Sequence, residues 1–162
     1  MGLNYQAPKI ILNWTAYTPV YLGTNQSNVT ILNCQWARDG RDLLLDFHFE
    51  FTGQVDSTAS PWYFQLPVVN GSQLNYDTTN ANGGSSLTTN SGRGHAGTAT
   101  WLQAGTGWKI IHACMDDASA GNQFRIRFAE NPGYVTMNQL TFTGQNSSIK
   151  SKHIRLPIVG WT

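Results

Sequence analysis

The stretch 43–51, LLLDFHFEF, alternates apolar and polar side chains along the chain. The apolar positions are Leu43, Leu45, Phe47, Phe49 and Phe51, and the polar positions between them are Asp46, His48 and Glu50. Successive side chains of a strand point to opposite faces, so this stretch predicts a strand with one buried and one solvent-facing side. A similar alternation recurs at 124–128 and 153–158, which indicates antiparallel sheet throughout the chain.

Composition favours the same fold class. Charged residues make up 12% of the chain, about half the usual share, while glycine, asparagine, serine and threonine are abundant. Helices usually use Glu, Lys and Ala, so we expect strands and turns with little or no helix. The 162 residues, 40% of them hydrophobic, suffice for one domain with a single core.

A hairpin is the clearest local prediction. The dipeptide Asp39-Gly40 separates strand-like runs at 29–38 and 42–51, and its tolerance of positive φ suits a tight turn. Further strands are expected at 62–68, 98–102, 108–115, 122–128, 134–143 and 152–159. About eight or more short strands with regular turns predict an antiparallel β-sandwich of the jelly-roll type.

The chain divides into an arm and one domain. Residues 1–12 form an N-terminal arm that contains the apolar run 10–12, and residues 13–162 form the β-sandwich domain. Residues 70–100 are rich in Gly, Asn, Ser and Thr with little to bury, so we expect a long loop there.

Several functional classes are disfavoured. A net charge of +1 offers no basic stripe for nucleic acid. No run approaches the roughly 20 apolar residues that span a bilayer, and the start lacks the basic and apolar regions of a signal peptide. We therefore expect synthesis in the cytoplasm and no membrane partner. Cys34 and Cys114 are expected as buried thiols rather than a disulfide.

No catalytic, cofactor or metal pattern stands out. The four histidines are dispersed, and none belongs to a recognised hydrolase or metal motif. The adjacent pair Asp116-Asp117 reads as a polar turn, with a calcium-binding loop as the alternative. We expect a protein that is not an enzyme and holds no cofactor.

Charges on the polar face of 43–51 have two interpretations. Asp46, His48 and Glu50 could supply a metal site or a general base. The favoured interpretation is an outer face that pairs with arginines across strands or across subunits. The candidate arginines are Arg125, Arg127 and Arg155. The segment 92–95, which includes Arg93 and His95, is expected at a loop tip that contacts a partner or receptor.

Tryptophans also have two interpretations. Trp36, Trp62 and Trp101 lie in strand-like runs and are expected in the core. Trp14, Trp108 and Trp161 lie near strand ends, where an indole could stack on a sugar or cover a subunit seam. Core filling is the favoured reading for the set.

Terminal signatures carry a resemblance to a known family. The segments are WTAYTP at 14–19, LGT at 22–24, NV at 28–29, WARDG at 36–40, LP at 66–67 and the ending PIVGW at 157–161. In this order they resemble the β-sandwich domain of tailed-bacteriophage virion structural proteins. The resemblance covers residues 13–162 and implies a fold like the C1q and tumour-necrosis-factor jelly rolls.

The family occurs as trimeric tail-fibre knobs, head fibres and capsid decorations. No heptad or collagen-like shaft precedes the domain in this sequence, which favours a decoration or cement subunit on the outer capsid surface. The resemblance implies a homotrimer within the virion whose partners are phage capsid or other virion proteins. The alternative is a fibre knob that binds a host polysaccharide through the loop 70–100 and exposed aromatics.

The arm is the expected capsid contact. Its candidate contact residues are Tyr5, Ile10, Ile11 and Leu12. We expect these apolar side chains to dock on a neighbouring subunit, because chain termini fray unless something holds them.

Overall fold

A computed structural model of the chain describes residues 11–22, 26–53, 63–75, 77, 95–103, 107–115, 125–129 and 147–162. Within these ranges the regular elements are β1 (Thr15–Ala16), β2 (Tyr21–Leu22), the 3-10 helix η1 (Gln26–Asn28), β3 (Val29–Asp39), β4 (Asp42–Phe51), β5 (Tyr63–Gln65), β6 (Val68–Val69), β7 (Ser72–Gln73), β8 (His95–Gln103), β9 (Gly107–Met115), β10 (Arg125–Ala129) and β11 (Ser147–Pro157). The predicted all-β class is confirmed.

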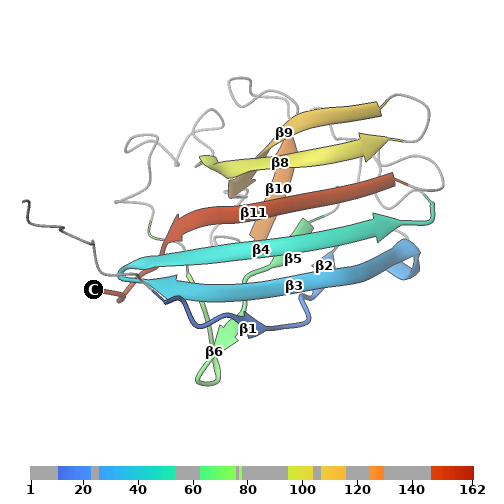
Figure 1. Ribbon diagram of the computed structural model, residues 1–162. Helices are drawn as coiled ribbons and strands as arrows, with labels where there is room; N and C mark the ends of the chain where they lie inside the picture. Colours follow the sequence, from blue (N-terminus) through green and yellow to red (C-terminus); the bar gives the residue numbers. More distant parts are fainter. Residues whose placement is uncertain are drawn as a thin grey trace, which may run out of the picture.

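One antiparallel sheet contains all the described strands except the β6–β7 hairpin. Its strand order is β1-β3-β4-β11-β8-β9-β10-β5-β2. Figure 1 views the outer face of the β3-β4-β11-β8-β9 part, with β10, β5 and β2 behind it. The strands are joined in one continuous sheet, and the two-sheet jelly roll stays a prediction.

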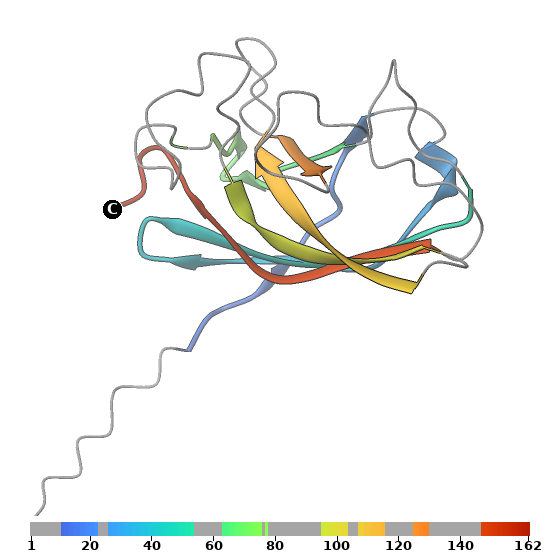
Figure 2. The ribbon, with the colours of Figure 1, turned by 90° about the horizontal axis from the view of Figure 1, so that it is seen from above.

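The sheet bends over its own buried face. Phe64 of β5 lies with its ring centroid 5.3 Å from Phe47 and 5.2 Å from Phe49 of β4. Four strands separate β4 from β5 in the strand order, so these contacts require the sheet to bend over itself (Figure 2). A core therefore forms between parts of one sheet.

The chain between β1 and β2 links the two edges of the sheet. The Tyr17 amide donates to the Cys34 carbonyl at 3.0 Å, beside β3 at one edge. The Gln65 amide donates to the Val20 carbonyl at 3.0 Å, beside β5 at the other edge. Because only residues 17–20 connect these two hydrogen bonds, the two edges of the sheet lie near each other and enclose the core.

Strand β4 has the faces that its alternation predicts. Its five predicted apolar positions are exposed by 1% or less: Leu43, Leu45, Phe47, Phe49 and Phe51. On the other face, Glu50 is exposed and Asp46 and His48 are half-buried. The central strand of the core was thus correctly oriented from sequence.

The β3–β4 hairpin forms with its turn one residue later than predicted. Asp39 pairs with Asp42, so Gly40 and Arg41 occupy the turn. Gly40 has φ +60° and Arg41 does not have a positive φ, which matches the glycine-first type II′ turn.

Regular structure enters the predicted loop 70–100 from both ends. A second hairpin, β6–β7, turns at Asn70 and Gly71, whose φ values of 52° and 77° are those of a type I′ turn. Strand β8 begins at His95. The expected strand 62–68 is interrupted within its described part, between β5 and β6. The expected strand 134–143 and the Asp116-Asp117 turn lie outside the described residues.

Candidate functional site

A trough of about 630 Å³ lies on the outer face of the sheet, over β3, β4, β11, β8 and β9. A single row of register partners crosses it from strand to strand. The row runs Asn33, His48, Lys150, Thr100 and Ile110. Asp46, Thr98 and Ser151 also line it. Five strands therefore contribute one side chain each to a continuous polar row that ends on an isoleucine.

Three irregularities of the strand pairing meet at this trough. Register shifts occur between Ile31 and Asn33, between Ser151 and Ile154, and between His95 and Gly97. Bulges bend strands and re-aim side chains, and they are common beside functional sites.

The hollow follows from where β11 leaves β8. Their ladder covers residues 148–150 of β11 and stops at the Lys150–Thr100 pair. Beyond it, the Ser151 hydroxyl donates to the Thr98 carbonyl at 2.5 Å, taking the place of a backbone donor. The side chain of Ser151 is buried, so the floor of the trough is polar and hydrogen-bonded.

Charges of both signs face the trough. The Asp46 carboxylate accepts a hydrogen bond from Gln35 Nε2 at 3.0 Å. The Lys150 ammonium lies 4.4 Å from the ring centroid of Trp108, a cation–π contact. Trp108 is 54% and Ile110 71% exposed, so apolar surface borders the polar row. The trough thus offers donors, acceptors and an apolar rim.

In the described part of the chain, no three His, Cys, Asp or Glu side chains gather closely enough to hold a metal ion. None of its helices has the length and apolar character needed to cross a membrane.

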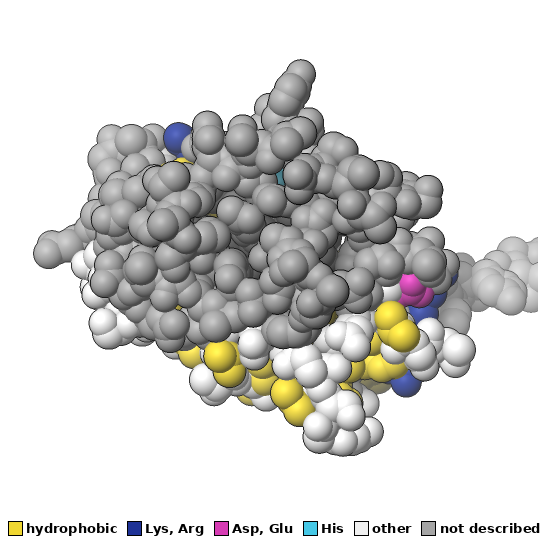
Figure 3. All heavy atoms as spheres, turned by 180° about the vertical axis from the view of Figure 1, so that it is seen from behind, with side chains coloured by type: hydrophobic (Ala, Val, Ile, Leu, Met, Phe, Trp, Pro, Cys, Tyr) yellow, Lys and Arg dark blue, Asp and Glu magenta, His cyan; other side chains and the backbone are white. Residues whose placement is uncertain are grey.

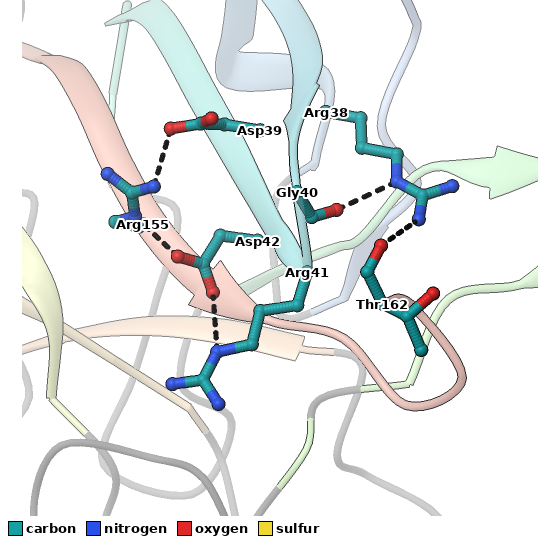
Figure 4. Close-up of polar contacts among 7 residues, drawn as sticks. All are labelled: Arg38, Asp39, Gly40, Arg41, Asp42, Arg155 and Thr162. Carbon is teal, nitrogen blue, oxygen red and sulfur yellow. Dashed lines mark hydrogen bonds and ion pairs between the residues drawn. The ribbon is translucent and has the colours of Figure 1, made fainter.

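The prediction that Arg155 pairs with the polar face of β4 is wrong within the described structure. Arg155 bonds Asp42 through Nε and Asp39 through Nη2, both at 2.5 Å, rather than Asp46, His48 or Glu50 (Figure 4). The physical reason is register, since Arg155 lies opposite Leu44, near the hairpin end of β4. The hydrogen bond to Asp42 raises the pKa of Arg155 above its ordinary value.

Other predicted site residues are spread over the chain. Asp46 and His48 line the trough, and Glu50 is exposed on the same face of β4. Arg125 and Arg127 belong to β10, and their side chains lie outside the described part. Arg93 also lies outside it. His95 is in strand β8, paired with Cys114, so the expected loop tip is wrong for this residue.

Part of the arm is described. Tyr5 and Ile10 lie outside the described residues. Ile11 is 79% exposed and Leu12 is half-buried. Figure 2 shows this segment leading away from the sheet, on the side of its outer face. The described end of the arm thus presents an apolar side chain to the surroundings.

A further apolar surface lies away from the trough. Seen from behind, hydrophobic side chains gather along the lower margin, where β1 and β6 lie in Figure 1 (Figure 3). Val20, between β1 and β2, is 56% exposed, and Val68 in β6 is 60% exposed. This margin is a second surface suited to contact with another protein.

The tryptophans and cysteines divide between core and surface. Trp101 is 3% exposed and Trp36 packs against the core, as predicted, while Trp62 lies outside the described residues. Cys34 is a buried free thiol, and the side chain of Cys114 lies outside the described part.

Most of the trough was not predicted from the sequence. The lining residues absent from the sequence predictions are Asn33, Thr98, Thr100, Ile110, Lys150 and Ser151. One signal was available in the sequence, because Trp108 and Ile110 are two residues apart and so lie on one face of a predicted strand.

Comparisons of the chain with protein-family models, with curated proteins and with solved structures find no match in any of the three.

Proposed function

We propose that this protein is a structural subunit of a tailed-bacteriophage virion that decorates the outer capsid surface. It binds capsid proteins through protein–protein contacts, assembles as a homotrimer and performs no catalysis. The resemblance of its terminal signatures to a virion β-sandwich domain supports this role.

The contact between two of those signatures adds support. Trp36 and Arg38 of the WARDG segment contact Trp161 of the PIVGW ending. Segments far apart in the sequence therefore act as one structural unit, as expected if both belong to one domain pattern.

The observation on which the proposal mainly rests is the exposure of Ile11. The Ile11 side chain is 79% exposed on a segment that leads away from the sheet. Covering this apolar surface with a partner protein would lower the free energy of the system. Together with the rest of the arm it would form an apolar strip that docks on a capsid subunit.

Such a subunit would stabilise the capsid through the total surface area that it buries against capsid proteins. A specific interface buries about 1,600 Å² in total, and a trimer can engage several capsomers at once. Multivalent attachment across capsomer joints resists internal pressure without any chemical step.

Removal of the arm tests the proposal. A variant lacking residues 1–12 should remain folded but fail to bind phage heads in a co-sedimentation assay. The matched control is Val159→Ser, which removes an exposed apolar side chain outside the arm and outside the β1–β6 margin and should bind normally. Binding of the truncated variant at the wild-type level would contradict the proposed anchor.

A second role, a head-fibre or tail-fibre knob that binds host polysaccharide, is favoured by the trough. Decoration and the tail-fibre form of this second role predict different particles. Decoration predicts recovery of the protein with DNA-filled heads that lack tails, whereas a tail-fibre knob would be absent from such heads. Saturable adsorption of the purified protein to host cells would favour the knob.

A further inference from the structure

We propose that the trough on the outer sheet face binds a saccharide chain that lies across the strands. This inference goes beyond capsid decoration and does not depend on it. It rests on the shape of the trough, on the chemistry of its row of side chains and on the bulges that build it.

The dimensions suit an extended, narrow ligand. The row from Asn33 to Ile110 crosses five neighbouring strands. Strands lie about 4.8 Å apart, so the row is about 19 Å long. A volume of about 630 Å³ falls in the range of small-ligand sites. A short run of sugar rings fits such a length and volume.

Side chains must recognise a ligand in the middle of the row. His48, Lys150 and Thr100 each pair with neighbouring strands on both sides, so the backbone there is engaged in ladders. A peptide that extends a sheet needs a free strand edge, and the middle of the row offers none. Recognition there comes from the side chains of the row.

The side chains of the row match hydroxyl groups. Asn33 offers both a donor and an acceptor, Asp46 retains acceptor capacity beyond its bond to Gln35, and Lys150 offers donors. Each sugar hydroxyl donates one hydrogen bond and accepts others, so it can satisfy either type. A ligand rich in hydroxyls uses this mixed set better than one that only accepts.

The apolar rim matches the C–H faces of sugar rings. Ile110 and Trp108 are exposed on β9, at the end of the polar row. Lys150 stands over Trp108, where its ammonium can also meet a sugar hydroxyl or carboxylate. Polar edges and apolar faces on the same ligand are characteristic of saccharides.

Other ligand classes fit less well. One lysine and one aspartate line the described trough, so it lacks the excess positive charge that phosphate chains require. A lipid tail would desolvate the half-buried Asp46 and His48 without offering either of them a hydrogen bond. The mixed lining favours a saccharide over both.

The test uses the full-length protein with two sets of oligosaccharides from bacterial surface polysaccharides, one neutral and one acidic, on an array and then by calorimetry. At least one member should bind with micromolar to millimolar affinity. Asp46→Ala and Lys150→Gln should each weaken that binding at least tenfold. Loss with Lys150→Gln for acidic members alone would identify a sugar carboxylate as the lysine's partner, still within the proposal.

The control is Glu50→Ala, on the same strand and face but outside the lining, which should change affinity less than twofold. Equal melting temperatures would show that the variants are folded, and if Asp46→Ala fails to fold, Lys150→Gln, an exposed position, decides the matter. Binding of no oligosaccharide at millimolar concentration, or unchanged binding by the folded trough variants, would overturn the proposal. Selective binding of extended peptides in the trough instead would overturn it as well. Heads that still bind the protein after such a failure would leave the decoration role intact.

Discussion

The indole rings of Trp36 and Trp161 lie 6.2 Å apart between centroids, at an interplanar angle of 38°. The Arg38 guanidinium lies 4.9 Å from the Trp161 ring and donates to the Thr162 carbonyl at 2.9 Å. Trp36 and Arg38 both belong to β3, so these contacts hold the last residues of the chain against the β3–β4 hairpin. Figure 4 draws Arg38 and Thr162.

Removing the Trp161 side chain should destabilise the fold measurably. We expect Trp161→Ala to lower the free energy of unfolding by about 2 kcal/mol, since it removes an aromatic pair and a half-buried surface. Urea denaturation measures the change. Val159→Ala, at a position 58% exposed, is the control and should stay within about 0.5 kcal/mol of wild type. Equal midpoints for both variants would mean that the Trp36–Trp161 contact is not stabilising.

A charge placed in the core should prevent folding. Phe49 is 0% exposed and its ring lies 5.2 Å from those of Phe47 and Phe64. Phe49→Asp should cost several kcal/mol, because an unpaired carboxylate would be buried. Circular dichroism and soluble yield report the loss. Glu50→Asp, one residue along on the exposed face, should behave as wild type, and a normally melting Phe49→Asp protein would reverse the assigned faces.

The ion pairs of Arg155 should contribute modestly and depend on salt. The side chain is 54% exposed and bonds Asp39 and Asp42. Arg155→Ala should lower the free energy of unfolding by about 0.5–1 kcal/mol, and less at 1 M salt, since solvent screens exposed pairs. Arg155→Lys should recover only part of it, because lysine lacks the two-pronged guanidinium. A salt-independent loss of several kcal/mol would contradict this account.

The Cys34 thiol should make stability fall at alkaline pH. Burial, the largest cause, raises its pKa from 9.0 to about 12. The unfolded chain therefore releases this proton at lower pH than the folded protein. Its stabilising contribution is full below about pH 9 and is lost as pH rises towards 12.

The slope of stability against pH isolates this effect. In that window the wild type should lose up to about 1.4 kcal/mol per pH unit more than Cys34→Ala does. Denaturation at a series of pH values gives both slopes, and the comparison of slopes cancels the packing cost of the substitution. Identical slopes, or rapid labelling of Cys34 by a thiol reagent in the native protein at pH 8, would contradict its burial.

The core could be predicted from the sequence where the local pattern of apolar and polar residues decides which side chains are buried. Alternation over residues 45–51 of β4 shows which side chains are buried, because a strand has only two faces. The Asn70-Gly71 turn was equally readable, since this dipeptide favours the type I′ hairpin, yet it was hidden within a segment whose composition suggested a loop. Local sequence pattern thus explains both why the faces of β4 were predicted and why the β6–β7 turn was overlooked.

The trough was not predictable because it depends on strand order and register. Asn33, Lys150 and Thr100 become neighbours only when β3, β4, β11 and β8 pair in that order with their bulges. The partner of Arg155 depends on the same pairing, since β11 lies beside β4 at the hairpin end. Sequence alternation assigns faces but does not say which strands adjoin.

The most direct test of the proposed role is an electron-microscopy map of the intact phage particle. The account predicts density for this domain on the outer surface of the head, in groups of three, with the segment containing Ile11 seated on capsid subunits. Density confined to the tail tip, or heads that lack the protein altogether, would contradict it.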